Sequence, residues 1–206
     1  MTNVDNWIMH NAPKQNRSKL RIQTIIETAE KILLEEGIEN ITIARISEVS
    51  GLKRTSTYKF FPTPHSVKQK MSNIYIKECI EHFKLNAENI NTDNLSVIVL
   101  KCVTVLFDYF NDNIKSQKII LSNEFSNSIE TEVFNELSST IQSYIDTNID
   151  LPDMFNKDGV YRVFTQIIIS IFALNIKESI SINEVGKIEA HRAGHAYLLS
   201  WVNQNS

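Results

Sequence analysis

The stretch 42–61 constrains the fold of this 206-residue chain more than any other part of it. Its apolar spacing predicts a short helix that ends at Ser50, followed by a second short helix over residues 53–59. Between the two, Gly51 allows the positive φ that a tight turn requires. Two short helices joined in this way are typical of a helix-turn-helix, whose second helix enters the major groove of DNA.

Helical periodicity also flanks this motif on both sides. Apolar residues recur every three or four positions from Ser18 to Gly37, which predicts a first helix. Thr42 is a suitable N-cap for the second helix. Thr63 and Pro64 fit the N-cap and the first position of a fourth helix that is expected to run to about residue 86. The motif therefore lies inside a small helical domain.

The rest of the chain has the same helical character. A segment at 160–176 is apolar on nearly every side, and a last helix is predicted over 183–203. Five Gly and four Pro leave few natural breakpoints, and no strand pattern is visible. We predict an all-α fold, with an amino-terminal three-helix helix-turn-helix domain followed by a larger helical ligand-binding and dimerisation domain. The expected boundaries are 1–17 for a flexible arm, 18–63 for the DNA-binding domain and 64–206 for the regulatory and dimerisation domain.

The distribution of charge separates the chain in the same way. Residues 1–70 hold 11 Lys and Arg against 7 Asp and Glu, a net charge of +4, and residues 71–206 hold 10 against 17, a net charge of −7. A basic amino-terminal third suits contact with phosphate, whereas the acidic remainder suits a domain that does not touch DNA.

Each position of the motif has an expected task. Three apolar residues, Ile43, Ile46 and Val49, should hold the supporting helix against the first helix. Leu52 and Phe61 should anchor the recognition helix from its inner side. These anchors leave the polar residues of the second helix for the DNA.

The outward residues divide by depth in the groove. The start of a recognition helix goes deepest, so residues 53–56 should face base edges. Tyr58 and Lys59 should lie closer to the phosphates. Phosphate contacts supply affinity and register, whereas base contacts supply sequence choice.

The spacing Thr42-x3-Ile46-Ser47-x3-Gly51-Leu52-x5-Tyr58-x-Phe60-Phe61-Pro62 resembles the DNA-binding signature of the TetR family of bacterial transcriptional regulators. The match covers roughly residues 20–70, and the remainder resembles the family in length and helix content. The resemblance implies an all-α homodimer whose larger domain dimerises and often binds an inducer. It also implies that Thr42 caps its helix and touches phosphate, and that Tyr58 hydrogen-bonds the DNA backbone.

Two positions depart from the family pattern. Thr55 stands where the family often has Gly, and Pro64-His65 stands where it often has Lys-Glu. The second departure removes a phosphate-contacting lysine, so Thr63, His65 or the amide groups at the helix start would have to replace it. The DNA-contacting residues that we predict are Thr42, Arg45, Lys53, Arg54, Thr55, Ser56, Tyr58, Lys59 and His65.

A small-molecule inducer is expected in the larger domain, and its chemistry is not specified by the sequence beyond an apolar or amphipathic character. Aromatic side chains at helical spacing either line such a cavity or fill the core. The candidates for the ligand pocket are Phe107, Phe110, Phe125, Phe134 and Phe164.

Other candidate sites have plain structural alternatives. His191 and His195 lie at i and i+4 on one helical face, but no Glu follows the first His and a packing role is favoured over a metal site. Cys79 and Cys102 suit buried thiols in a reducing compartment. No nucleophile-base constellation is visible. We therefore predict no catalytic residues, no metal site and no cofactor.

The sequence as a whole favours a DNA-binding transcriptional regulator that is not an enzyme. We expect a ligand-responsive repressor that binds a palindromic double-stranded DNA operator as a homodimer. The alternative is a helical binding protein of the same fold that acts through a protein or small-ligand partner without DNA. The amino terminus lacks the pattern of a signal peptide, and the apolar run at 167–174 is shorter than the roughly 20 residues of a bilayer span, so we expect no membrane association and a cytoplasmic location.

Overall fold

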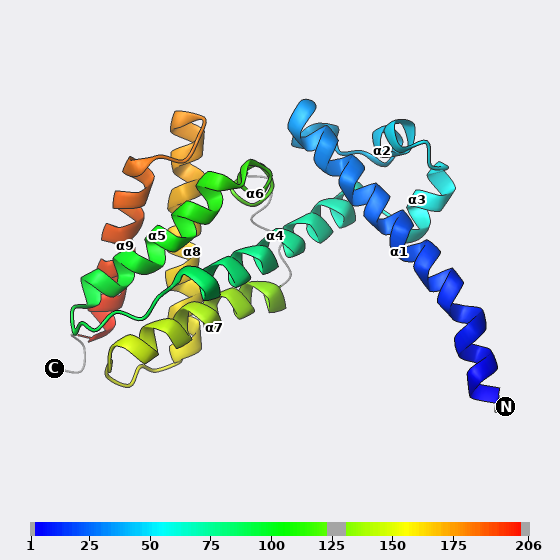
Figure 1. The fold of residues 1–206 in the computed structure, drawn as a ribbon. Coiled ribbons are helices and arrows are strands. Elements are labelled where there is room, and N and C mark those ends of the chain that lie inside the picture. The colour runs from blue at the N-terminus through cyan, green and yellow to red at the C-terminus, as the bar shows by residue number, and fades with distance from the viewer. Residues whose placement is uncertain (1–2, 123–130, 203–206) are drawn as a thin grey trace. The chain divides into compact units, whose positions relative to one another are not determined.

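The structure is a computed structural model that describes residues 3–122 and 131–202. Every regular element in these two ranges is a helix, as the sequence predicts (Figure 1). The helices are α1 (Asn3–Glu35), a 3-10 turn (Ile38–Asn40), α2 (Ile43–Ser50), α3 (Arg54–Phe60), α4 (Pro64–Asn86), α5 (Leu95–Asp112), α6 (Ile114–Ile120), α7 (Thr131–Asn148), α8 (Lys157–Ser179) and α9 (Glu184–Val202).

Helix α1 is longer than the sequence predicts. It begins at Asn3, so residues 3–17 are helical where a flexible arm was expected, and the predicted start at Ser18 is wrong. Apolar periodicity detects only the part of a helix that packs against neighbours. Asn16 and Arg17, at the end of the expected arm, are exposed, and exposed helical residues need no apolar stripe.

The chain folds as two compact units, one that ends at Met71 and one that begins at Ser72. The amino-terminal unit buries one stripe of α1 against α2, and α3 packs on α2. Ile25, Ala29 and Ile32 of α1 are fully buried, and Ile46 of α2 is buried with them. These are the periodic apolar residues from which the sequence predicts the first two helices.

The unit boundary lies inside α4 and not at its start. Val67 and Met71 in the first two turns of α4 are fully buried and belong to the amino-terminal unit. The boundary predicted between residues 63 and 64 was placed at the Pro-rich interruption of the chain. A single helix that supplies side chains to two cores carries no such interruption, so its sequence does not mark the division.

The start of α4 itself is confirmed. The Ser66 amide donates to Thr63 Oγ1 at 3.1 Å, and the Thr63 amide donates to Ser66 Oγ at 3.3 Å. This reciprocal pair satisfies two backbone donors at a helix start, in the manner of a capping box. Pro64 occupies the first helical position, where its missing N–H costs no hydrogen bond.

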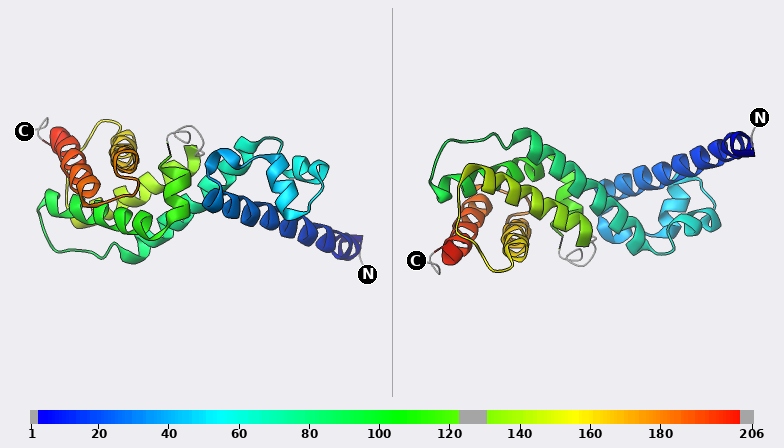
Figure 2. Two further views of the ribbon diagram at one scale, coloured as in Figure 1. Left: turned by 90° about the horizontal axis from the view of Figure 1, so that it is seen from above. Right: turned by 90° about the horizontal axis from the view of Figure 1, so that it is seen from below.

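The carboxyl-terminal unit packs α5, α7, α8 and α9 into one core, and α8 lies against both α7 and α9 (Figures 1 and 2). Phe110 of α5 meets Phe172 of α8 edge to face, with the ring centres 6.2 Å apart. Tyr161 and Phe164 make a similar contact at 6.4 Å. These four aromatic side chains therefore pack in pairs in the interior of the unit.

Helix α8 is 23 residues long and, by length and composition alone, apolar enough to cross a membrane. Its apolar side chains are used in the core of the unit, where Tyr161, Phe164 and Ile168 are fully buried. Helices at the centre of soluble bundles are apolar on most faces for the same reason. Burial of these side chains accounts for part of the apolar composition of α8, whose Val163 and Leu174 are exposed.

The two thiols lie in the same interior. Cys79 and Cys102 are free and fully buried. Burial raises the pKa of both thiols well above the ordinary value, because the thiolate loses its hydration there. Neither is a reactive thiolate at neutral pH.

Candidate nucleic-acid interface

Helices α2 and α3 have the geometry of a helix-turn-helix. Thr42 is in extended conformation and its Oγ1 accepts from the Arg45 amide at 3.1 Å, which confirms the predicted N-cap. Gly51 ends α2 with φ 71 and ψ 4, the left-handed conformation predicted for the turn. The Leu52 amide then donates to Ser50 Oγ at 3.2 Å. The turn is thus fixed on both sides of the glycine.

Buried hydroxyl groups join the two helices. Ser47 Oγ on α2 and Thr57 Oγ1 on α3 lie 3.3 Å apart, and both residues are buried. Thr57 Oγ1 also lies 3.4 Å from the Lys53 carbonyl oxygen, at the start of α3. Buried hydroxyl groups need hydrogen-bond partners, so this contact helps to fix how α3 lies on α2. Thr57 is not among the residues predicted from the sequence, because a threonine inside a polar helix carries no signal of burial.

The apolar anchors are largely those predicted. Ile43, Ile46 and Phe61 are buried. Leu52 is half-buried. Val49 differs, because 37% of it is exposed, so its predicted place among the anchors of α2 is wrong. Val49 lies two residues before the glycine turn, where α2 is leaving the core.

The opposite side of α3 carries the predicted DNA-contacting set. Four of these side chains, Lys53, Arg54, Thr55 and Lys59, are exposed, and Ser56 is half-buried. Tyr58 leaves 52% of its surface exposed, which is unusual for a residue whose ring is large and apolar. Thr57 holds the inner face of α3 against α2, while the opposite face, with its cations and Tyr58, is exposed. The arrangement gives a helix that can enter a groove without losing its own support.

Arg45 has a different environment from the other predicted DNA contacts. Its guanidinium donates to Glu36 from Nε at 3.0 Å and from Nη2 at 2.7 Å, and Nη1 lies 3.0 Å from Glu48. Glu36 follows the last residue of α1, so this cluster ties α1 to α2. The hydrogen bond from Arg45 lowers the pKa of Glu36 below its ordinary value. The guanidinium is therefore engaged within the domain, in contrast to the exposed cations of α3.

The start of α4 presents a further polar edge. His65 is exposed at the second position of the helix, next to Pro64. The first amide groups of a helix attract anions such as phosphate. The amide groups of Thr63 and Ser66 already donate to each other's hydroxyl groups. The exposed side chain of His65 is open to a phosphate at this helix start.

Three of the five aromatic residues predicted for a ligand pocket lie in the packed interior of the carboxyl-terminal unit. Phe107, Phe110 and Phe164 are buried in close contact with other aromatic rings, so these candidates belong to the packed core. Phe134 is half-buried on α7. Phe125 lies outside the described residues. A periodic aromatic residue has the same sequence signal in a core as in a pocket wall, which is why the sequence did not distinguish them.

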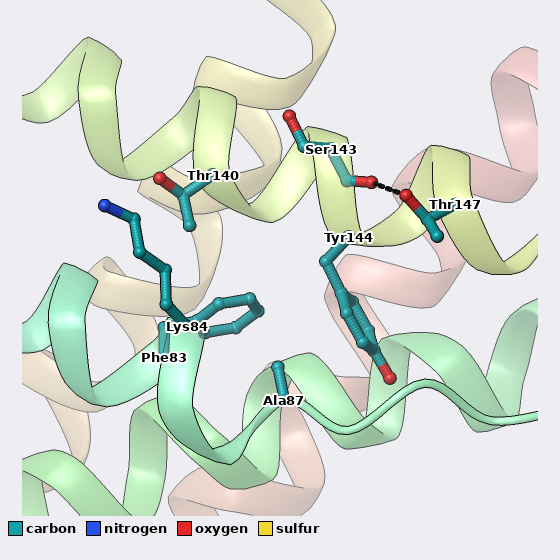
Figure 3. Close-up of a pocket in the computed structure, with 7 residues that line it drawn as sticks. All are labelled: Phe83, Lys84, Ala87, Thr140, Ser143, Tyr144 and Thr147. Atoms are coloured by element: carbon teal, nitrogen blue, oxygen red, sulfur yellow. Dashed lines mark hydrogen bonds between the residues drawn. The ribbon is translucent and has the colours of Figure 1, made fainter.

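A groove of about 330 Å³ lies elsewhere in the same unit, between the end of α4 and α7. Figure 3 shows its lining residues: Phe83, Lys84, Ala87, Thr140, Ser143, Tyr144 and Thr147. Thr140, Ser143 and Thr147 follow one another at i, i+3 and i+7, which places three hydroxyls on one face of α7. That spacing marks a polar face of α7 in the sequence, but it does not show that α4 lies opposite.

His191 has a hydrogen-bonding role in the packing of α9. Its Nε2 lies 3.0 Å from the Ser96 carbonyl oxygen and 3.1 Å from Ser96 Oγ, at the start of α5. With the proton on Nε2, His191 donates to that carbonyl. The ring of His195 stacks on it with the centres 6.0 Å apart. The packing interpretation of this pair accounts for the contacts that His191 makes.

The two units together define a class of protein, in which a helix-turn-helix head precedes a separate all-α domain. No family model and no curated protein matches the sequence. Among solved structures, the chain is similar to a TetR-family transcriptional regulator from Streptomyces coelicolor, with a TM-score of 0.65 and 14% identity over 88% of this chain and 99% of that one. It is also similar to SmeT, the repressor of the Stenotrophomonas maltophilia multidrug efflux pump SmeDEF, with a TM-score of 0.57 and 13% identity over 88% and 90%. The chain has a TetR-like fold.

Proposed function

We propose that this protein is a DNA-binding transcriptional regulator of the TetR type. The observation that carries the proposal is the recognition helix α3, whose buried face is fixed to α2 through Thr57 and whose open face presents Lys53, Arg54 and Tyr58. Cations on a short, supported helix meet both needs of an operator-binding protein, because they contact phosphate and reach base edges.

We further propose that the protein acts as a homodimer. Helix α8 exposes Val163 and Leu174, and α9 exposes Val185, Ile188 and Leu199. On each helix these residues fall on one side. Val163 and Leu174 are 11 residues apart, as are Ile188 and Leu199, which is close to three full turns, and Val185 lies three residues before Ile188. Two such stripes from each of two copies would form a four-helix bundle. Two recognition helices about 34–36 Å apart would then read a palindromic operator.

Ligand response completes the proposal. A ligand changes DNA binding only if it binds one conformation of the protein better than the other. Helix α4 runs without a break from the buried core of the amino-terminal unit to the groove in the carboxyl-terminal unit. A ligand in that groove therefore touches the element that enters both units. We propose repression that the ligand relieves, in the cytoplasm.

The direct test is selection of operator sequences from random DNA, followed by a gel shift in increasing salt. We expect sequence-selective binding whose affinity falls with salt, because cation–phosphate contacts release counterions. The variant Arg54→Ala should change the preferred sequence, and Lys118→Ala, an exposed cation of α6, is the matched control. A protein that selects no sequence, or binds DNA equally well with Arg54→Ala and Lys59→Ala combined, would contradict the proposal.

The second candidate function is a protein of this fold that binds a protein or small ligand without DNA. Burial of the side chains around residues 53–59 would have favoured this alternative, and in the single chain most of them are exposed. An all-α enzyme is a third possibility. Among the described residues, the groove between α4 and α7 presents hydroxyls that already donate to backbone carbonyls, which is not the arrangement of an activated nucleophile.

A further inference from the structure

Two exposed arginines continue the buried side of α1 beyond the core of the amino-terminal unit. Thr28 and Ile32 of α1 are buried. Arg17 lies 11 residues before Thr28, and Arg21 lies 11 residues before Ile32, a separation close to three full turns of helix. Both arginines are exposed. The side of α1 that packs into the core in its second half therefore carries cations in its first half.

Lys19 is also exposed, but it lies on a different side of α1. Two residues turn an α-helix by roughly 200°, so Lys19 lies across the helix from both Arg17 and Arg21. The three cations are close neighbours in the sequence, and only two of them share a side. This arrangement allows the role of one side of α1 to be tested apart from the role of its charge.

Arg17 and Arg21 lie outside the hydrophobic core. From Asn16 onward, the first buried residue of α1 is Ile25. At about 1.5 Å per residue, Arg21 and Arg17 precede it by about 6 and 12 Å along the helix axis. Figures 1 and 2 show that the amino-terminal part of α1 continues past α2 and α3, which belong to the same unit. A large partner can therefore reach these arginines together with the exposed side of α3.

Neither arginine has an acidic neighbour in the surrounding sequence. Residues 6–26 include four Lys and Arg residues and no carboxylate. Like charges four residues apart destabilise a helix, so Arg17 and Arg21 oppose each other until an anion lies against both. This side of α1 suits a partner that carries closely spaced negative charges.

The DNA backbone is the anion best placed to meet these arginines. When a recognition helix lies in the major groove, the helix that precedes it crosses the strand at the edge of that groove. Each strand carries a phosphate about every 3.4 Å along the DNA axis, so two arginines about 6 Å apart can each meet one. An α-helix is about 10–12 Å across and the minor groove is about 6 Å wide, so α1 would lie over a strand and not inside that groove.

We propose that Arg17 and Arg21 bind the phosphates beside the half-site that α3 reads, so that α1 is a second DNA-contacting element of the head. Phosphate contacts carry no base information, and the two arginines therefore raise the affinity for every sequence alike. The inference rests on the proposed function, because α3 must first place the head on DNA. The competing partner is the acidic carboxyl-terminal domain of a second copy, whose residues 71–206 carry a net charge of −7.

Salt dependence measures how many phosphates the arginines contact. The duplex obtained by operator selection would be titrated with the full-length protein, and binding followed by fluorescence anisotropy between about 50 and 200 mM salt. For each head on the DNA, Arg17→Ala with Arg21→Ala should lower the slope of log affinity against log salt by about 1.8. Over this range of salt the wild type should therefore lose roughly tenfold more affinity than the double variant. The preferred sequence should not change.

Two further variants separate a phosphate contact from a general effect of charge or folding. Lys19→Ala removes a like charge from the other side of α1 and should leave the slope unchanged. Arg17→Lys with Arg21→Lys keeps both charges and should keep most of the slope, because a phosphate also binds a point charge. An equal change per charge in Lys19→Ala, or a lysine variant that behaves like the alanine variant, would contradict the proposal.

The length of the duplex shows where the arginines bind. One duplex would end flush with the selected site, and a second would extend it by about ten base pairs on each side, roughly the length of α1 before Ile25. The wild type should bind the longer duplex on the order of tenfold more tightly. The double alanine variant should bind both duplexes alike. A wild type that does not distinguish the two duplexes would show that α1 contacts no flanking phosphate.

These measurements separate the inference from the proposed function. Sequence-selective binding that the double alanine variant retains with an unchanged slope would overturn the inference and leave the regulator in place. If sedimentation of that variant then showed a change in oligomeric state, the arginines would belong to a contact between copies. A wild type that binds no DNA of any sequence would refute the proposed function, and this inference with it.

Discussion

Asn175 occupies the space that a side chain at Gly186 would need. A Cβ at position 186 would lie 2.4 Å from Asn175 Oδ1, and both residues are buried at the junction of α8 and α9. The Asn175 side chain accepts from the Asn183 amide at 2.9 Å and donates to Asn183 Oδ1 at 3.1 Å. One side chain on α8 therefore fixes the residue before α9.

Gly186→Ala should destabilise the protein for this reason. Alanine is the better helix former by about 1 kcal/mol, but overpacking against a buried, hydrogen-bonded amide costs about 1–3 kcal/mol. We expect a net decrease in the free energy of unfolding, measured in urea. Ser200→Ala on the exposed side of α9 is the control and should change stability by less than about 0.5 kcal/mol. An unchanged Gly186→Ala protein would mean that Asn175 has another position in solution.

Thr57→Val should disturb the recognition helix without changing its shape. The substitution leaves Ser47 Oγ buried without the partner that lies 3.3 Å away, and an unsatisfied buried hydroxyl costs about 1–3 kcal/mol. Adding Ser47→Ala removes the stranded hydroxyl, so the double variant should recover part of the loss. The measurement is a double-mutant cycle of urea unfolding. Additive effects of the two substitutions would show that the hydroxyls do not interact.

The sequence predicted those parts of the DNA-binding head that follow from local rules. Thr42 caps α2 and Gly51 turns the chain because a cap and a positive φ depend on adjacent residues. The Ser47–Thr57 pair depends on the angle at which α2 and α3 cross, and the sequence of either helix alone does not predict that angle. Arg45 is similar, because its partner Glu36 lies beyond the end of another helix.

In the larger domain the sequence predicted helices but not which of their faces meet. Phe110 and Phe164 are periodic and apolar, and this is equally true of a core residue and of a pocket wall. The groove instead uses Thr140 and Thr147, which on α7 alone resemble an ordinary solvated face. Their place in a groove depends on the end of α4 lying opposite, which is a matter of tertiary packing.

The ion pair between Glu36 and Arg45 should make the head sensitive to acid. The hydrogen bond from Arg45 holds the pKa of Glu36 below its ordinary value of 4.5. A lowered pKa in the folded state means that the pair stabilises the fold above pH 4.5, and that this contribution is lost as the pH falls through the lowered pKa. Thermal unfolding measured from pH 7 to pH 3 should therefore show a smaller loss in Glu36→Gln than in the wild type. The melting temperatures of the two proteins should converge at the acidic end, and parallel curves would contradict the assignment.

The proposed dimer gives a prediction that the monomer alone does not. Ile188 on α9 leaves 52% of its surface exposed, and Ile114 on α6 leaves 49%. Only Ile188 lies on the stripe shared with Val185 and Leu199, so Ile188→Glu should place an unpaired charge inside the dimer interface while Ile114→Glu should not. Sedimentation at micromolar concentration should show a monomer for Ile188→Glu and a dimer for Ile114→Glu and the wild type. Operator affinity should fall for Ile188→Glu alone, because one recognition helix then reads one half-site. A dimer that survives Ile188→Glu would move the interface away from α9.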